Sequence, residues 1–195
     1  IFTTGLLLAG LFSLFLVHST VGIRVDNVLH DQVYDTKLRN EVSILGIDDA
    51  SLQKIGAWPW ERDTFAEALD MLYAKGARLV VFDILFLEER TGDKEMRAIL
   101  EAHNLPTIFA SKLDKDSALI ESVYKDNIQV THGVAHVYPD DDGKVRTIPL
   151  SQKDKFDKCH KSLAYQAFII YSKQDESWCD TTPRPFLFQQ TPPKT

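Results

Sequence analysis

The sequence contains little cysteine and no run of positive charge. Its 195 residues include two cysteines, and the net charge is −6. Nucleic acid is therefore excluded as an expected partner, because binding phosphates requires a basic patch. The sequence also lacks a glycine loop that could cradle phosphate, a nicotinamide-binding fingerprint and a recognisable serine or cysteine nucleophile motif. We accordingly expect no cofactor.

Charged residues are missing from the first part of the chain. Residues 1–23 contain no Asp, Glu, Lys or Arg. A helix of this length would reach about 34 Å, enough to cross a hydrocarbon layer of about 30 Å. We predict a transmembrane helix at 1–23 and a juxtamembrane segment at 24–41. The alternatives are a cleaved signal peptide, with a weak small-residue site near Ser19, and a buried helix of a soluble protein.

The two cysteines, Cys159 and Cys179, are 20 positions apart. If the domain lies outside the cytoplasm, in an oxidising compartment, they could form one disulfide. Two unpaired thiols are the alternative, and the sequence leaves both open.

Apolar patterns along residues 42–195 predict one domain, 44% of the whole sequence being hydrophobic. Strands are expected at 42–47, 78–87 and 106–110, and helices at 51–55, 64–75 and 94–103. This alternation predicts an α/β fold with a mainly parallel sheet and helices on both faces. A strand at 128–138, a turn at 140–143 and a strand at 144–150 predict an added β-hairpin. A helix is expected at 161–173, and a strand is possible at 186–188.

Acidic residues follow two of the expected strands. Asp48 and Asp49 follow the first, and Asp83 lies within the second. Grouped at one sheet edge, these carboxylates could bind Mg²⁺ or Ca²⁺ and support a metal-dependent hydrolase or phosphotransferase using Asp48 and Asp83. We favour structural roles, in which Asp49 caps a helical turn and Asp48 or Asp83 pairs with Arg62.

Two tryptophans flank a proline in the segment 58–60. Trp58 and Trp60 could stack on a ligand, but we favour packing, since large aromatics more often supply buried area. The histidines His132 and His136 are four apart on an expected strand and would need further ligands to bind zinc. The acidic residues before Gly143 predict a turn rather than a calcium loop.

Several of these segments, in this order, resemble one family. They comprise Asp31, Tyr34 and Asp35; Ile47, Asp48, Asp49, Ala50, Ser51 and Leu52; Gly56, Trp58, Pro59, Trp60 and Arg62; Gly76 and Ala77; Phe82, Asp83, Ile84, Leu85 and Phe86; Asp142, Gly143 and Arg146; and Ser162, Leu163 and Ala164. Together they resemble the second type of CHASE domain, the extracellular sensory domain associated with cyclases and histidine kinases.

This resemblance implies a non-catalytic, ligand-sensing input domain of a bacterial transmembrane receptor at the inner membrane. The output enzyme would be an adenylate or guanylate cyclase, a histidine or Ser/Thr kinase, or a diguanylate cyclase. Such domains usually continue past this length, so we expect the domain to be incomplete at its C-terminus. A homodimer is expected, with an unidentified small ligand. Candidate ligand-binding residues are Asp48, Asp49, Trp58, Trp60, Arg62 and Asp83. A secreted binding module is the remaining alternative.

Overall fold

The computed structural model describes residues 42–140, 143–174 and 179–185. Within it, Gly46–Phe186 form one compact unit. The predicted transmembrane helix at 1–23, the juxtamembrane segment at 24–41 and the possible strand at 186–188 lie outside the described residues. In the ranges that are described, no helix has both the length and the apolar character needed to cross a membrane.

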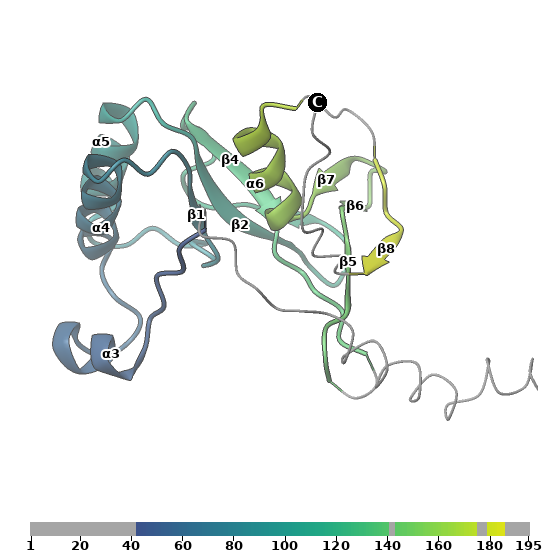
Figure 1. Ribbon diagram of the computed structural model, residues 1–195, viewed down its shortest axis with the longest axis horizontal. Helices are drawn as coiled ribbons and strands as arrows, with labels where there is room; N and C mark the ends of the chain where they lie inside the picture. The colour runs from purple at the N-terminus through teal and green to yellow at the C-terminus, as the bar shows by residue number, and fades with distance from the viewer. Residues whose placement is uncertain (1–41, 141–142, 175–178, 186–195) are drawn as a thin grey trace, which may run out of the picture. The chain divides into compact units, whose positions relative to one another are not determined.

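The described ranges form short helices and strands, labelled in Figure 1. The helices are α3 (Asp49–Ile55), α4 (Arg62–Ala74), α5 (Asp93–Ala102) and α6 (Leu163–Ser172). The strands are β1 (Val80–Phe82), β2 (Thr107–Leu113), β3 (Leu119–Ile120), β4 (Val130–Val134), β5 (Thr147–Pro149), β6 (Ser151–Lys153), β7 (Cys159–Lys161) and β8 (Pro183–Pro185).

The largest sheet is built around β2. This strand pairs in parallel with β1 and with β4, and it pairs antiparallel with β3. Val80 and Val130 both lie opposite Thr107, so the two parallel neighbours share one register at the start of β2. Thr107 to Ser111 are fully buried, which matches a strand with neighbours on both sides.

The predicted fold class is wrong, because the sheets are mixed and several pairs are antiparallel. Two further sheets have two strands each, β5 with β8 and β6 with β7, and both are antiparallel. The expected hairpin between 128–138 and 144–150 does not form. The first of these segments supplies β4 to the main sheet, and the second supplies β5, which pairs with β8. Sequence patterns identified strand-forming residues there but not their partners.

Two predicted buried strands are also corrected. Residues 42–47 form no strand, and Val42, Ile44 and Leu45 are 65%, 77% and 75% exposed. The run 78–87 yields only β1, and its burial alternates rather than being continuous. Phe82 and Phe86 point inward while Val81 and Leu85 are exposed, so this segment has one buried face.

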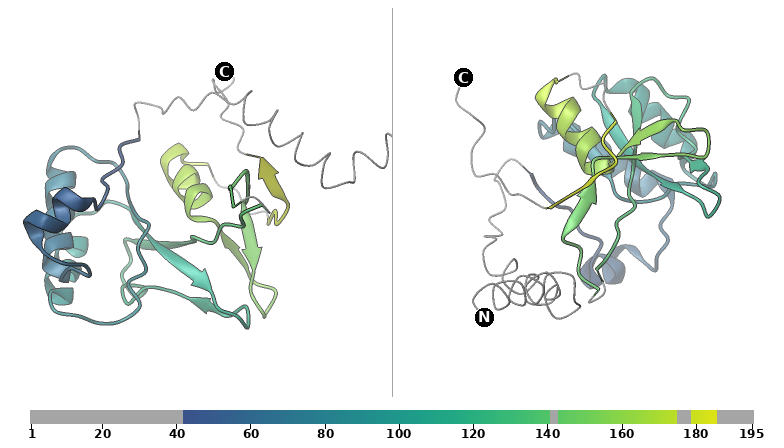
Figure 2. Two further views of the ribbon diagram at one scale, coloured as in Figure 1. Left: turned by 90° about the horizontal axis from the view of Figure 1, so that it is seen from below. Right: turned by 90° about the vertical axis from the view of Figure 1, so that its right-hand side faces the viewer.

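The core lies between the main sheet and the pair α4 and α5, which pack side by side (Figure 1 and Figure 2). Spacing at i, i+4 and i+8 along α4 places Phe65, Leu69 and Tyr73 on its buried face. Fully buried Phe109 of β2 stacks on Phe82 of β1 with ring centroids 4.9 Å apart. The ring of Phe65 in α4 also contacts that of Phe82, with centroids 6.3 Å apart, so aromatic contacts join α4 to the sheet.

Helix α6 begins close to β4. A Cβ added to Gly133 would lie 2.5 Å from the Cα of Leu163, so only glycine allows this approach. Ser162 caps the helix by accepting a hydrogen bond from the backbone N–H of Tyr165. This contact fixes the start of α6 beside the end of the main sheet.

Candidate functional site

The Trp-Pro-Trp loop packs against the start of α4. The ring of Phe65 lies 6.0 Å from that of Trp58 and 6.1 Å from that of Trp60. The indole N–H of Trp60 donates to the carbonyl of Gly56 at 2.8 Å. Trp58 keeps 45% of its surface exposed. Both tryptophan rings thus pack against Phe65. A role for them in stacking on a ligand stays a prediction.

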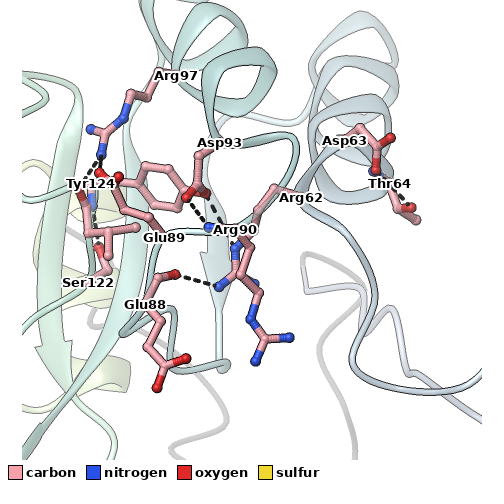
Figure 3. Close-up of polar contacts among 11 residues, drawn as sticks. Arg62, Asp63, Thr64, Glu88, Glu89, Arg90, Asp93, Arg97, Ser122 and Tyr124 are labelled. Carbon is pink, nitrogen blue, oxygen red and sulfur yellow. Dashed lines mark hydrogen bonds and ion pairs between the residues drawn. The ribbon is translucent and has the colours of Figure 1, made fainter.

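Arg62 occupies the centre of a buried polar group at the base of this loop (Figure 3). Its side chain is 6% exposed, and Nε lies 3.4 Å from Oδ1 of Asp93. Nη2 donates to the carbonyl of Glu88 at 3.2 Å, and the guanidinium lies 4.3 Å above the ring of Phe86. The expected pairing of Arg62 with Asp48 or Asp83 is therefore wrong, since its acidic partner is Asp93.

Asp93 is in turn held by two further donors. Its Oδ2 accepts from the backbone N–H of Arg90 at 2.7 Å, and Oδ1 accepts from the hydroxyl of Tyr124. Burial raises the pKa of Tyr124, and the bond to Asp93 and the charge of Asp93 raise it further. Tyr124 therefore stays a neutral donor. We call Arg62, Phe86, Asp93 and Tyr124 the arginine cluster.

Gly92 lets the two helix starts approach each other at this cluster. It precedes α5 with a φ of +87°, and a Cβ added there would lie 2.2 Å from the backbone nitrogen of Asp63. Both its backbone conformation and its space exclude a side chain. Arg62 and Asp93, each at the first position of its helix, meet because of this glycine.

The predicted acidic candidates lie on the surface. Asp48, not Asp49, is the N-cap of α3, and its Oδ1 accepts from the backbone N–H of Ser51 at 2.9 Å. Hydrogen bonds from Ser51 lower the pKa of Asp48. Asp49 is the first residue of α3, and Asp83 is exposed just after β1. Across the described ranges, no three or more His, Cys, Asp or Glu residues form a group that could hold a metal ion.

A separate hollow of about 260 Å³ lies beside the later part of β2, and we call it the polar pocket. It is lined by Ser111 in the second half of β2 and by His132 in the middle of β4. Its lining comes from β2, β3, β4, β7 and α6 and comprises Ser111, Leu119, Glu121, His132, Cys159, His160, Lys161 and Gln166.

His132 forms one wall of the polar pocket. Its Nε2 accepts from the backbone N–H of Ser122 at 3.3 Å and lies 2.8 Å from the hydroxyl of that serine. Nδ1 lies 3.7 Å from Oε1 of Glu121. Burial lowers the pKa of His132, Glu121 partly opposes this shift, and Lys125 adds to it. His132 is thus held in its neutral form at pH 7.

Further lining residues come from β7 and α6. His160 Nε2 lies 2.9 Å from Oδ2 of Asp154, and this contact lowers the pKa of Asp154 together with hydrogen bonds from two backbone N–H groups. A disulfide joins Cys159 to Cys179 with an S–S distance of 2.04 Å. In the described part of the chain, the ammonium of Lys161 and the side-chain amide of Gln166 have no polar partner.

Sequence reasoning noted only His132 and Cys159 among the residues that line the pocket. The other six are spread from Ser111 to Gln166, and no short motif links them. The missed partner of Arg62 had a clearer signal. Gly92 followed by Asp93 and Glu95 is typical of a helix start, and it placed a carboxylate in the first turn.

Comparison with curated proteins gives no match, and neither does comparison with solved structures. The model of one family, described as CHASE2 domain, matches residues 4–193. The match spans nearly the whole chain, including the Trp-Pro-Trp loop, the arginine cluster and the polar pocket. The chain therefore belongs to the CHASE2 domain family, a family of extracellular sensory domains.

Proposed function

We propose that this chain is the ligand-sensing input domain of a bacterial transmembrane receptor, lies outside the cytoplasm and has no catalytic activity of its own. The observation that carries the proposal is the polar pocket, in which Lys161, Gln166 and Ser111 present polar groups that the fold leaves unused. Polar groups that line a hollow and have no partner within the fold are able to bind a ligand.

Attachment to a membrane is supported by the sequence of residues 1–23, which contains no charged side chain. The disulfide is a second support, because such bonds persist in oxidising compartments outside the cytoplasm. The receptor would act as a homodimer. The dimer would have two alternative arrangements of its domains, and the ligand would favour one of them. Binding would thereby shift the population of signalling states of a fused cyclase or kinase.

The pocket can be tested by filling it. Gln166→Trp on the full chain places an indole in the pocket, and Met71→Trp places one on α4, where Met71 is 57% exposed. Amino acids, organic acids, sugars and polyamines are assayed singly for a rise in melting temperature. We expect at least one to stabilise the wild type and the Met71→Trp variant but not Gln166→Trp.

Two results would contradict the proposal. One is a panel in which no compound stabilises the wild type, and the other is equal stabilisation of Gln166→Trp, whose fold is checked by circular dichroism. Chromatography of the bound compound after incubation tests the absence of catalysis, and we expect it to be recovered unchanged. Sequencing the gene downstream of the Thr195 codon tests the receptor assignment by searching for a membrane segment and an effector domain.

A further inference from the structure

We propose that the polar pocket binds a small zwitterion with one ammonium and one carboxylate group, that is, a free α-amino acid. This inference rests on the proposed sensory function of the pocket. It is carried by the presence of both charge signs on one small hollow, because Glu121 and Lys161 both line it. Among the described contacts these two side chains form no ion pair with each other.

Lys161 and two neighbours suit a carboxylate. The ammonium of Lys161 can donate to either carboxylate oxygen, and the amide N–H of Gln166 is a second donor. Ser111 is the third, and it is 1% exposed, with no hydrogen-bond partner for its hydroxyl in the described ranges. Ser111 lines the hollow, and its hydroxyl can donate to a bound carboxylate.

Glu121 suits an ammonium group. Its carboxylate lies 3.7 Å from Nδ1 of His132. The backbone N–H of Ser122 must be the donor to Nε2, so the single proton of neutral His132 resides on Nδ1, facing Glu121. Because burial lowers the pKa of His132, the ring does not neutralise Glu121. The negative charge of Glu121 is therefore left for a ligand.

The same charges exclude other classes of small ligand. An inorganic phosphate would meet the carboxylate of Glu121, and a polyamine would meet the ammonium of Lys161. A neutral sugar would partly desolvate both charges without neutralising either. The volume of about 260 Å³ lies just below the range of drug-sized sites, which fits a ligand as small as an amino acid.

Isothermal titration of the full chain with each standard L-amino acid tests this inference. The best binder is then compared with its amide, which lacks the carboxylate charge, and with its 2-hydroxy acid, which lacks the ammonium. We expect both analogues to bind about tenfold or more weakly, because each leaves one charged pocket group without its partner.

Two single substitutions test whether Lys161 binds the carboxylate of the ligand and Glu121 binds its ammonium group. Lys161→Gln and Glu121→Gln should each weaken amino-acid binding about tenfold or more. Glu121→Gln should also abolish the preference for the amino acid over its 2-hydroxy acid, which a general loss of structure would not do. The matched controls are Lys54→Gln on α3 and Glu101→Gln on α5, both exposed and outside the pocket lining, and they should leave affinity unchanged.

The possible failures can be told apart. If no amino acid binds, or if the amide or hydroxy acid binds equally well, the zwitterion inference is overturned. When some other compound stabilises the wild type and Gln166→Trp blocks it, the pocket remains the sensory site and only the ligand class is wrong. If an amino acid binds wild type and Gln166→Trp alike, both the inference and the proposed role of the pocket are refuted.

Discussion

The arginine cluster and the polar pocket lie in one compact unit, yet they use their charges in opposite ways. In the cluster, Arg62 is paired with Asp93, and Asp93 accepts from Tyr124 and from the backbone of Arg90. In the pocket, Lys161 has no such partner among the described residues. The cluster therefore serves stability, and the pocket keeps its polar groups free for another molecule.

This contrast bears on the most distinctive stretch of the sequence. The Trp-Pro-Trp loop and Arg62 stand out because they combine large aromatics with charge. In the structure, however, Trp58 packs against Phe65 and Arg62 pairs with Asp93. The pocket has no comparable signature. In this chain, the conspicuous motif therefore marks residues that stabilise the fold. The polar side chains without a partner in the fold mark the place where a ligand can bind.

The largest effect is expected on removing the centre of the arginine cluster. Arg62→Ala leaves the carboxylate of Asp93 buried without its cation, and breaking such a buried pair costs about 3 to 5 kcal/mol. Urea denaturation measures the free energy of unfolding. Arg90→Ala is the control, because that side chain is exposed, and it should change stability by less than about 0.5 kcal/mol. Equal effects of the two substitutions would remove the structural role given to the cluster.

A somewhat smaller loss is expected on the pocket side when the disulfide is removed. The bond between Cys159 and Cys179 closes a loop with a sequence separation of 20, so its loss should cost about 3 kcal/mol through the entropy of the unfolded chain. The double variant with serine at both positions is compared with the wild type under oxidising and reducing conditions. Reduction should lower the wild type to the level of the variant and leave the variant unchanged.

Comparing alanine substitutions at Gly92 and Gly76 separates two causes of lost stability, a strained backbone conformation and a steric clash of the added Cβ. Gly92→Ala suffers both, with φ at +87° and a Cβ 2.2 Å from the nitrogen of Asp63, and should lose about 2 to 3 kcal/mol. Gly76→Ala has a similar φ of +90° but open space around its Cβ, so it should lose only about 1 kcal/mol. Similar losses in thermal unfolding would show that the close approach of α4 and α5 is not tight.

Protonation of His132 should weaken the fold in mildly acidic solution. Its pKa is lowered in the folded state, so between about 6.5 and that lower value the unfolded chain binds a proton that the folded chain does not. Stability is therefore fully present above about pH 6.5 and falls as pH drops, by at most about 1.4 kcal/mol per pH unit. His132→Gln should flatten this part of the profile. Asp48 and Asp154 have pKa values below 3.8 and affect only more acidic solutions.

The smallest effect on stability is expected from substituting Lys161, a pocket residue whose side chain has no partner among the described residues. Lys161→Gln should change the free energy of unfolding by less than about 0.5 kcal/mol, since its ammonium has no partner to lose among the described residues. Denaturation without added ligand is the appropriate measurement. A loss comparable to that of Arg62→Ala would mean that Lys161 is a structural residue, and the contrast between cluster and pocket would fail.

Local patterns predicted the helices well and the sheets poorly. The expected helices at 64–75, 94–103 and 161–173 correspond to α4, α5 and α6 within two residues at each end, because helical periodicity and end signals are local. Strand pairing depends on distant residues, so the partners of β5 and β6 could not be read from the sequence.

The candidate sites show the same limit. Arg62 was correctly expected to pair with a carboxylate, but the choice of Asp93 depends on how α4 meets α5 at Gly92. The polar pocket depends on an even larger set of contacts. Glu121 and Lys161 are 40 positions apart, and only the folding of β3 and β7 around β2 brings them to one cavity.

The disulfide at Cys159 connects the pocket wall to a distant segment of the chain. Cys159, His160 and Lys161 form β7, and Cys179 leads through Asp180 into β8. The carbonyl of Asp180 also accepts from the backbone N–H of Ser151 in β6, the strand paired with β7. The wall is therefore fastened to the segment before β8 by one covalent bond and, through β6, by a backbone hydrogen bond. Reduction of the disulfide removes the covalent connection and leaves only the hydrogen-bonded one.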